Sequence, residues 1–274
     1  MKIKIIYLFL FALISSIAIA QSAREYLNKG LDAFDNKEYR KAIFYFDKAI
    51  SIDPDFVDAY FARGVAYDDL DDYDMAVLDY TKAIEIDRSY VDAYYNRGIL
   101  YRKKGLYNLA LDDYTRAIEL KPNDARYYNN RAVVYKYMKE YEKMIPDCDK
   151  ALDLNPKYGR AFWNRGFAYQ SLKQFDRAIE DYNLAIKYEP KFPDPYYNRG
   201  TCLYLKGEFN KALTDLNKAI ELYDEDADYF VNRGLVNYKL GNNDKAIKDW
   251  NTAIRINPDL KDQLQPYIKE AQNK

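Results

Sequence analysis

The chain has 274 residues, of which 49% are hydrophobic, 16% aromatic and 31% charged, so it is neither disordered nor collagen-like. Its 42 basic and 43 acidic residues give a net charge of −1, without the basic excess that is typical of nucleic-acid-binding proteins, so we expect no nucleic-acid partner. The chain contains no histidine, which excludes Ser-His-Asp and Cys-His catalysis and any metal site with histidine ligands.

The first 20 residues have the three-part layout of a secretory signal peptide. Lys2 and Lys4 supply the positive start, residues 5–14 form an unbroken apolar run, and residues 17–20 read Ile-Ala-Ile-Ala, which ends in the A-x-A pattern of a cleavage site. The apolar run is shorter than the roughly 20 residues that a membrane-spanning helix needs. We therefore expect residues 1–20 to be a signal peptide, cleaved during export to the periplasm or out of the cell, and no membrane insertion after cleavage. An uncleaved anchor is the alternative.

From residue 23 to residue 260 the sequence repeats every 34 residues, without an insertion. One series of glycines recurs at multiples of this spacing, with Ala132 in the vacant place: Gly30, Gly64, Gly98, Gly166, Gly200 and Gly234. One series of alanines keeps the spacing without a break: Ala49, Ala83, Ala117, Ala151, Ala185, Ala219 and Ala253. The seven copies are expected at residues 23–56, 57–90, 91–124, 125–158, 159–192, 193–226 and 227–260.

Each copy predicts two amphipathic helices joined by a polar turn. In the third copy, Tyr94, Gly98 and Tyr101 follow the 3.6-residue spacing of a helix face, and a polar turn follows at residues 103–105. Prolines mark the end of the second helix in five copies, because proline cannot continue a helix: Pro54, Pro122, Pro156, Pro190 and Pro258. The recurring glycines and alanines lack bulk, so the backbones of neighbouring helices are expected to approach closely there.

The segment after the last copy predicts one further helix. Residues 261–274 carry Leu264, Tyr267 and Ile268 among polar residues. We expect this helix to cover the open end of the stack, with Pro266 in or near its first turn.

The 34-residue period and its aromatic, glycine, alanine and proline places resemble the tetratricopeptide repeat (TPR) over residues 23–260. The resemblance implies an all-α fold, a right-handed α-solenoid of helix-turn-helix units with a C-terminal capping helix. It also implies a scaffold that binds other proteins, and it does not identify the partner.

We expect an exported scaffold that binds a protein or an extended peptide, with no enzyme activity and no cofactor. Carboxylates are abundant, but each lies at a repeated place, and no unique cluster or inserted loop could form a catalytic pocket. The alternative is a polysaccharide-binding or export accessory protein that uses aromatic side chains as sugar platforms. End-to-end self-association stays open, because the ends of such arrays often stack.

The resemblance places the first helix of each copy on the concave surface and predicts a ligand groove there. The expected ligand-binding residues are Asn96, Asn130, Asn164, Asn198, Asn232, Tyr95, Trp163, Phe167, Tyr197, Arg102, Lys136 and Tyr204. The asparagines form a row that is broken only at Ala62 and resembles the asparagine ladder of the TPR domain in O-GlcNAc transferase. An amide offers a donor and an acceptor, so it can pair with a peptide backbone. The alternative is that the asparagines only bond neighbouring helices.

Within this groove, Trp163, Phe167 and Tyr197 are the expected anchors for apolar side chains of the partner. The inward places of the first two copies hold other apolar residues: Leu27, Leu31, Phe61 and Val65.

The two cysteines, Cys148 and Cys202, are expected to be buried free thiols. They lie 54 residues apart, so an entire copy separates them. We therefore expect the distance between their Cα atoms to exceed the ~7 Å limit for a disulfide. The acidic run at residues 68–74 lacks the glycine and the closing glutamate of an EF-hand loop, so no metal site is expected.

Six copies carry an arginine before the recurring glycine or alanine, and the same six carry an aspartate on the second helix. The arginines are Arg63, Arg97, Arg131, Arg165, Arg199 and Arg233, and the aspartates are Asp79, Asp113, Asp147, Asp181, Asp215 and Asp249. Because both are missing from the first copy, we expect a ladder of Arg–Asp pairs within a repeat or between neighbours. A row of anion sites is the alternative.

The fourth copy departs most from the others. Ala132 replaces glycine and Met144 replaces alanine, which adds volume at one helix–helix contact, and Pro146 falls inside the second helix. We expect a locally wider repeat with a kinked helix, and a hinge as the functional alternative.

Overall fold

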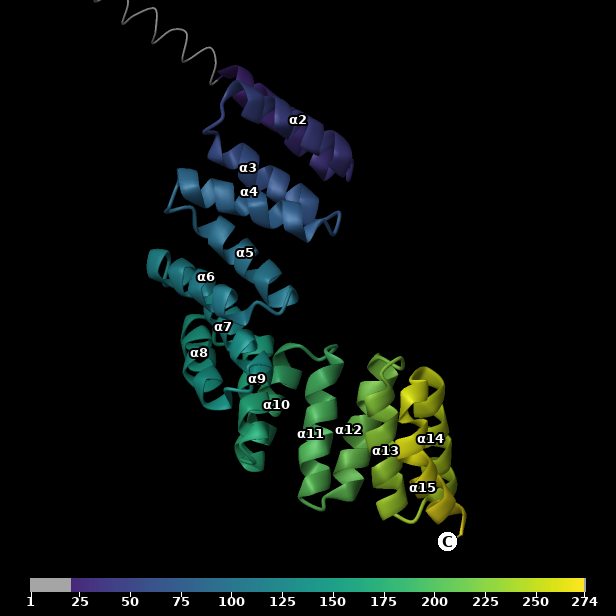
Figure 1. Cartoon of the computed structure of the whole chain (residues 1–274). Helices are drawn as coiled ribbons and strands as arrows, with labels where there is room; N and C mark the ends of the chain where they lie inside the picture. The colour runs from purple at the N-terminus through teal and green to yellow at the C-terminus, as the bar shows by residue number, and fades with distance from the viewer. Residues whose placement is uncertain (1–20, 274) are drawn as a thin grey trace, which may run out of the picture. The chain divides into compact units, whose positions relative to one another are not determined.

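The computed structural model describes residues 21–273 and contains only helices and turns in this range (Figure 1). The expected signal peptide at residues 1–20 lies outside the described residues. Between residues 21 and 273, no helix is long and apolar enough to cross a membrane.

Every expected repeat contains one pair of helices. The first helices are residues 21–35, α3 (Val57–Asp68), α5 (Val91–Lys103), α7 (Ala125–Tyr137), α9 (Gly159–Ser171), α11 (Pro193–Leu205) and α13 (Ala227–Lys239). The second helices are α2 (Tyr39–Ile52), α4 (Tyr73–Ile86), α6 (Tyr107–Leu120), α8 (Tyr141–Leu154), α10 (Phe175–Tyr188), α12 (Phe209–Leu222) and α14 (Asn243–Ile256). A 3-10 turn, η1 (Pro258–Leu260), and α15 (Lys261–Gln272) follow. The expected all-α repeat fold is confirmed.

The chain divides into two compact units after Asn123, at the border between the third and fourth repeats. In the first unit, α3 packs on α2 and α4, and α5 packs on α4 and α6. In the second unit, each helix from α7 to α15 packs on the next, and the neighbouring first helices α7, α9, α11 and α13 also contact one another in order. Each unit is therefore a stack in which every repeat contacts only its neighbours.

The turn inside each repeat has the same backbone conformation in all copies. Its residue at the fifteenth place of the repeat has a φ between 58° and 80°: Lys37, Asp71, Gly105, Lys139, Lys173, Gly207 and Gly241. This left-handed conformation ends a helix and favours glycine, because a Cβ atom is strained there. Three repeats meet the preference with glycine, and four hold lysine or aspartate.

The core of a repeat forms where a glycine of the first helix meets a bulky residue of the second helix. A Cβ atom at Gly166 would lie 2.8 Å from the Tyr182 ring, and one at Gly98 would lie 3.1 Å from the Tyr114 ring. The bulky residues at this place are fully buried: Phe46, Tyr80, Tyr114, Tyr182, Leu216 and Trp250. The recurring glycine is thus the residue that lets the ring lie against the helix backbone.

The fourth repeat fills the same contact with a different set of side chains. Ala132 stands in the glycine's place and Cys148 in the ring's place, and both lie with Met144 in one buried cluster. Because cysteine is much smaller than tyrosine, Ala132 and Met144 occupy space that a ring fills elsewhere. Cys148 offsets much of the volume that Ala132 and Met144 add, and the expected wider spacing of this repeat stays a prediction. Pro146 lies inside one continuous helix of 14 residues, the length of α6 and α10, and the expected kink stays a prediction.

The expected Arg–Asp ladder is confirmed, and it links repeats as well as helices. Arg165 donates Nε to Asp181 Oδ2 (2.8 Å) and Nη2 to Asp181 Oδ1 (2.7 Å), and it donates Nη1 to Asp149 of the preceding repeat (2.6 Å). The two-bond contact recurs in Arg63–Asp79, Arg97–Asp113, Arg131–Asp147, Arg199–Asp215 and Arg233–Asp249. The six aspartates are only 3% to 5% exposed, so the arginines are the counter-charges of buried carboxylates.

Both cysteines are buried and free, as expected. At the C-terminal end, α15 buries Leu264, Ile268 and Ala271 against α14, so the expected capping helix is present. Pro266 lies in its second turn, next to the first, which agrees with the expected position in or near the first turn.

Candidate functional site

The expected binding residues occupy the fifth, sixth, ninth and twelfth places of their repeats, all on first helices. We call the surface formed by these places and the second place the first-helix face. In each unit this face contains a pocket, and the second unit adds a cluster of aromatic and charged side chains.

The cluster joins the fourth and fifth repeats of the second unit and reaches the residue before α11. Lys136 on α7 places its Nζ 4.4 Å from the ring centroid of Trp163 and 4.2 Å from that of Phe167, both on α9. The Trp163 ring meets Phe192, the residue before α11, edge to face at 5.2 Å. Lys136, Trp163 and Phe167 are all half-buried, so the ammonium group lies against two aromatic faces at the surface.

Lys136 is a partly desolvated cation without a paired carboxylate. Among the described residues it forms no ion pair within 4.0 Å. Burial lowers the pKa of Lys136, and the more distant Asp194 offsets this only in part. Asp194 itself accepts a hydrogen bond of 2.6 Å from the Tyr229 hydroxyl. An incoming carboxylate would therefore meet an ammonium group that is not in direct contact with any described acid.

The asparagine row of the second unit mainly links neighbouring repeats. Asn164 is 1% exposed and donates Nδ2 to Asn129 Oδ1 at 2.8 Å. Asn198 is 8% exposed and accepts a hydrogen bond of 2.7 Å from Trp163 Nε1. Asn232 donates to Thr201 Oγ1 at 3.0 Å. These contacts match the alternative in which the asparagines bond neighbouring helices. In this conformation, Asn164 and Asn198 position the array and do not offer their amides to a ligand.

The remaining expected residues of the second unit lie beside this cluster. Tyr197 stacks on Tyr229 with centroids 4.8 Å apart, and burial raises the pKa of Tyr197 to about 12. Tyr204 packs on Phe209 at 5.6 Å. A pocket of about 210 Å³ follows, lined by Thr201, Tyr204, Leu205, Leu216, Asn232 and Leu235. Asn130, at the start of this unit, donates Nδ2 to the carbonyl of Arg126 on its own helix.

In the first unit the expected residues are Tyr95, Asn96 and Arg102, all half-buried on α5. The Tyr95 ring packs on Tyr114 at 6.0 Å. Arg102 lies at the place in the third repeat that Lys136 holds in the fourth.

An apolar hollow of the first-helix face lies in the first two repeats. It has a volume of about 380 Å³ and is lined by Arg24, Leu27, Asn28, Leu31, Phe34, Phe46, Asp58, Phe61, Ala62, Val65 and Tyr90. Leu27, Leu31, Phe61 and Val65 were expected on this face, but the binding anchors were expected in the fifth and sixth repeats only.

Residues that precede a first helix also belong to the site, and the sequence interpretation missed them. Phe192 packs on Trp163, and Tyr90 packs on Phe61 with centroids 5.2 Å apart. The available signal was the recurrence of aromatic residues at the last place of four repeats: Phe56, Tyr90, Tyr158 and Phe192.

Two aspartates of the acidic run at residues 68–74 have structural partners. Asp72 caps α4 by accepting a hydrogen bond from the Met75 amide, and Asp68 pairs with Lys103. Within the described residues, no group of three cysteine, aspartate or glutamate side chains could hold a metal ion.

Family models match most of the repeat region. One, described as tetratricopeptide repeat, matches residues 23–56, 91–124, 125–158, 193–226 and 227–260, which are five of the expected copies and more than half of the chain. The chain belongs to the tetratricopeptide repeat family. Two further models, described as TPR repeat and tetratricopeptide repeat, match residues 67–105 and 171–207, and residues 45–77. The TPR fold is that of a protein-interaction scaffold.

Solved structures of TPR proteins have similar folds. A tetratricopeptide repeat protein from Parabacteroides merdae is 21% identical with a TM-score of 0.70, over 92% of this chain and 99% of its own. MamA is 27% identical with a TM-score of 0.55, over 59% and 94%. YrrB, a TPR protein with an unusual peptide-binding site, is 24% identical with a TM-score of 0.55, over 65% and 92%. A comparison with curated protein sequences gives no significant match.

Proposed function

We propose that this TPR protein binds an extended segment of a partner protein on its first-helix face. The observation that carries the proposal is the Lys136 cluster, in which a half-buried cation without an ion pair lies on the rings of Trp163 and Phe167. Partly desolvated charges and exposed aromatic rings are costly for a protein on its own, and both become favourable when a complementary partner covers them.

The chemistry of the cluster favours a segment in which an acidic residue adjoins an apolar one. A carboxylate can pair with Lys136 in surroundings that rings partly shield from water, where such a bond is stronger than at an open surface. The adjoining apolar side chain can pack on the Trp163 and Tyr197 rings, because aromatic residues supply a large contact area at low cost in conformational entropy.

The asparagine row supports the proposal in a different way from the one expected. Asn164 and Asn198 connect α7 to α9 and α9 to α11 through side-chain hydrogen bonds, and the second of these bonds orients the Trp163 ring. A face whose rings are already fixed loses less entropy on binding than a mobile one. YrrB shows that the same fold is compatible with peptide binding.

The polysaccharide alternative has less support. A neutral sugar that stacked on Trp163 or Phe167 would leave unused the charge of the Lys136 ammonium group that lies on both rings.

Selection from a displayed library of random 12-residue peptides tests the proposal on the chain that starts at Gln21. We expect enriched peptides with an acidic residue beside an aromatic or aliphatic one. Lys136→Met keeps the apolar stem and removes the charge, so binding should weaken about tenfold, as expected for a charged hydrogen bond. The control Lys139→Met removes an exposed lysine three residues away and should bind like the parent. Failure to enrich any peptide, or equal binding by the Lys136 variant, contradicts the proposal.

We further propose that the scaffold works outside the cytoplasm, after removal of residues 1–20. The support is the layout of Lys2 and Lys4, the apolar run at residues 5–14 and the A-x-A pattern at residues 18–20. Cell fractionation with N-terminal sequencing tests this. We expect an exported chain that begins at Gln21. A variant with two aspartates in the apolar run should stay in the cytoplasm. A chain that stays in the cytoplasm with its N-terminus intact would refute export.

A further inference from the structure

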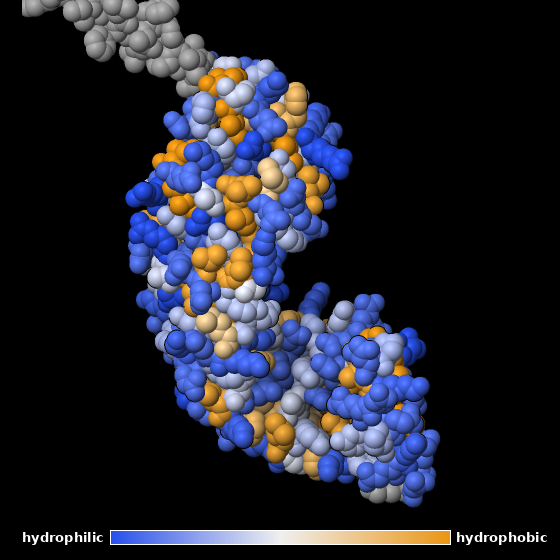
Figure 2. Space-filling model, in the orientation of Figure 1, coloured by the Kyte–Doolittle hydropathy of each residue, from blue (hydrophilic) through white to orange (hydrophobic). Residues whose placement is uncertain are grey.

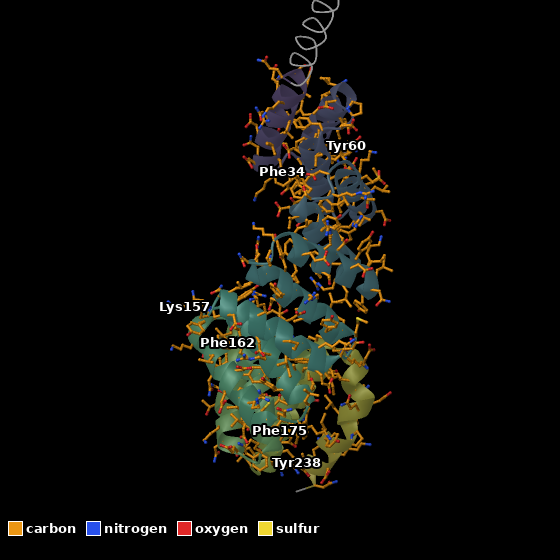
Figure 3. The ribbon with its side chains drawn as sticks, turned by 90° about the vertical axis from the view of Figure 1, so that its left-hand side faces the viewer. Phe34, Tyr60, Lys157, Phe162, Phe175 and Tyr238 are labelled. Carbon is orange, nitrogen blue, oxygen red and sulfur yellow. The ribbon has the colours of Figure 1, made fainter. Side chains whose placement is uncertain are left out.

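The pocket in the first two repeats occupies the same repeat places as the Lys136 cluster but has different chemistry. Phe34 holds the twelfth place of the first repeat, where Lys136 stands in the fourth, and it is labelled on the first unit in Figure 3. Phe61 and Val65 hold the places of Trp163 and Phe167. The pocket of about 380 Å³ is mostly apolar, and its size falls in the usual range of ligand-binding pockets.

Ala62 explains why the pocket is open. All six other repeats have asparagine at this place, at Asn28, Asn96, Asn130, Asn164, Asn198 and Asn232. In the fifth to seventh repeats this asparagine reaches a residue 35 or 31 positions earlier, as in the bonds of Asn164 with Asn129 and of Asn232 with Thr201. The same offsets from Ala62 lead to Leu27 and Leu31, which line the pocket and offer no hydrogen-bonding side chain. An asparagine here would extend into the pocket without a partner, whereas alanine leaves the space free.

The rim of the pocket carries one cation that no carboxylate neutralises. Arg24 lines the pocket, is exposed, and forms no ion pair within 4.0 Å among the described residues. Asp58, the acid on the rim, already accepts a hydrogen bond of 3.1 Å from the Tyr90 hydroxyl. The rim therefore carries one positive and one negative group, of which Asp58 is engaged by Tyr90 and Arg24 has no paired carboxylate.

We propose that this pocket takes a bulky apolar side chain of the partner polypeptide, with a neighbouring acidic residue paired to Arg24. The inference rests on the proposed binding of an extended segment and adds a second anchoring site in the other unit. Leu31 is 42% exposed, and a side chain seated in the pocket covers it. Figure 2 shows that apolar patches are present on the surface of this unit, over α4 and α5, and the pocket differs from them in being concave and bordered by Arg24.

A methyl NMR titration of the chain from Gln21 with the peptide acetyl-Gly-Phe-Glu-Gly-amide tests this site. We expect saturable shift changes at the methyl groups of Ala62, Leu27, Leu31 and Val65. The peptide with serine in place of phenylalanine should bind at least about tenfold more weakly, because it buries no ring. The peptide with glutamine in place of glutamate should bind to the parent more weakly than the glutamate peptide does. The two peptides should bind equally to the Arg24→Gln variant.

Filling the pocket provides the matched variants. Ala62→Asn restores the residue of the other repeats, and Ala62→Leu fills the space without a polar group. Each variant should bind the phenylalanine peptide at least about tenfold more weakly than the parent does. The methyl signals away from the pocket should stay the same as in the folded parent. Asn108→Ala removes an exposed asparagine from the second helix α6, away from the first-helix face, and should leave binding unchanged.

Equal binding by both Ala62 variants overturns the inference. So do shift changes confined to the surroundings of Trp163, a result that leaves the proposed function intact. If the full chain loses the response that the chain from Gln21 shows, residues 1–20 occupy the pocket. If the shifts depend on protein concentration alone, a second copy occupies it. Both of these results also overturn the proposal.

Discussion

Replacing Gly166 by alanine tests whether the glycine–ring contact sets the spacing of the two helices in a repeat. On an exposed helix this change stabilises by about 1 kcal/mol, because alanine is the better helix former. Here the new Cβ atom would lie 2.8 Å from Cε1 of Tyr182, whose fully buried ring has no free space to move into. Overpacking of this kind costs about 1–3 kcal/mol, so we expect a net destabilisation of about 1 kcal/mol.

The fourth repeat indicates how the cost can be relieved. Because Ala132 coexists there with Cys148, the Gly166→Ala change should be better tolerated when Tyr182 is also replaced by cysteine. Tyr182→Cys alone should cost about 3 kcal/mol through the cavity that it leaves. In the double variant the new methyl group enters that cavity, so the two changes should be less than additive by about 1–2 kcal/mol.

Urea unfolding followed by circular dichroism measures all four members of this cycle. The hydrogen bond from the Tyr182 hydroxyl to Gln170 is lost in both cysteine variants and therefore cancels. Tyr182→Phe keeps the ring and serves as the control, with no expected coupling to Gly166→Ala. Additive effects within about 0.5 kcal/mol would refute the reasoning.

Three further outcomes follow from the packing of the array. Arg165→Met leaves the buried Asp181 without its counter-charge and should lower the free energy of unfolding by about 3–5 kcal/mol at pH 7.5. Burial raises the pKa of Asp181, so stability is lost as the pH rises through that pKa, and the loss relative to the parent should be smaller at pH 5. Equal losses at the two pH values would contradict this. Cys148 and Cys202 should resist a thiol reagent in the native protein and react after unfolding. Burial raises the pKa of both thiols, that of Cys202 to about 12. Fast labelling without denaturant would show that the thiols are accessible. Lys173→Gly should raise the free energy of unfolding by up to about 1 kcal/mol, and with it the urea midpoint, because φ is 60° at this turn. A lowered midpoint would argue against strain there.

The 34-residue period was sufficient to predict the fold because every repeat packs only on its neighbours. Residues at the same place of different copies therefore have similar packing environments, and comparing them shows what each place requires. The joint absence of arginine and aspartate from the first copy predicted their pairing, and the six pairs form. The bond from Arg165 to Asp149 was not predicted, because the partner at that place varies from aspartate to threonine and asparagine in other repeats.

The candidate site was less predictable, because an inward-facing place can serve a ligand or the neighbouring repeat. Asn164 and Asn198 occupy such places, yet both are buried and bonded to the preceding repeat. The sequence does contain the signal that separates the two roles, since a polar partner stands 35 residues before each of them and Leu27 stands 35 residues before Ala62. The compensation of Ala132 by Cys148 could be found in the same way, by comparing three places together instead of one at a time.

The central claim is that the first-helix face binds the partner, and binding of a display-selected peptide to the Trp163→Ala/Tyr197→Ala variant tests it most directly. These substitutions remove the Trp163 ring that contacts Lys136 and the Tyr197 ring of the following repeat. Tyr196→Ala, next to Tyr197 on α11 with its ring beside Arg199, is the control for loss of an aromatic residue. Circular dichroism must show that all three proteins remain helical at the assay temperature. We predict that the double variant loses about 2–4 kcal/mol of binding free energy in calorimetry while the control binds like the parent. Equal affinity of the folded double variant and the parent would contradict the claim.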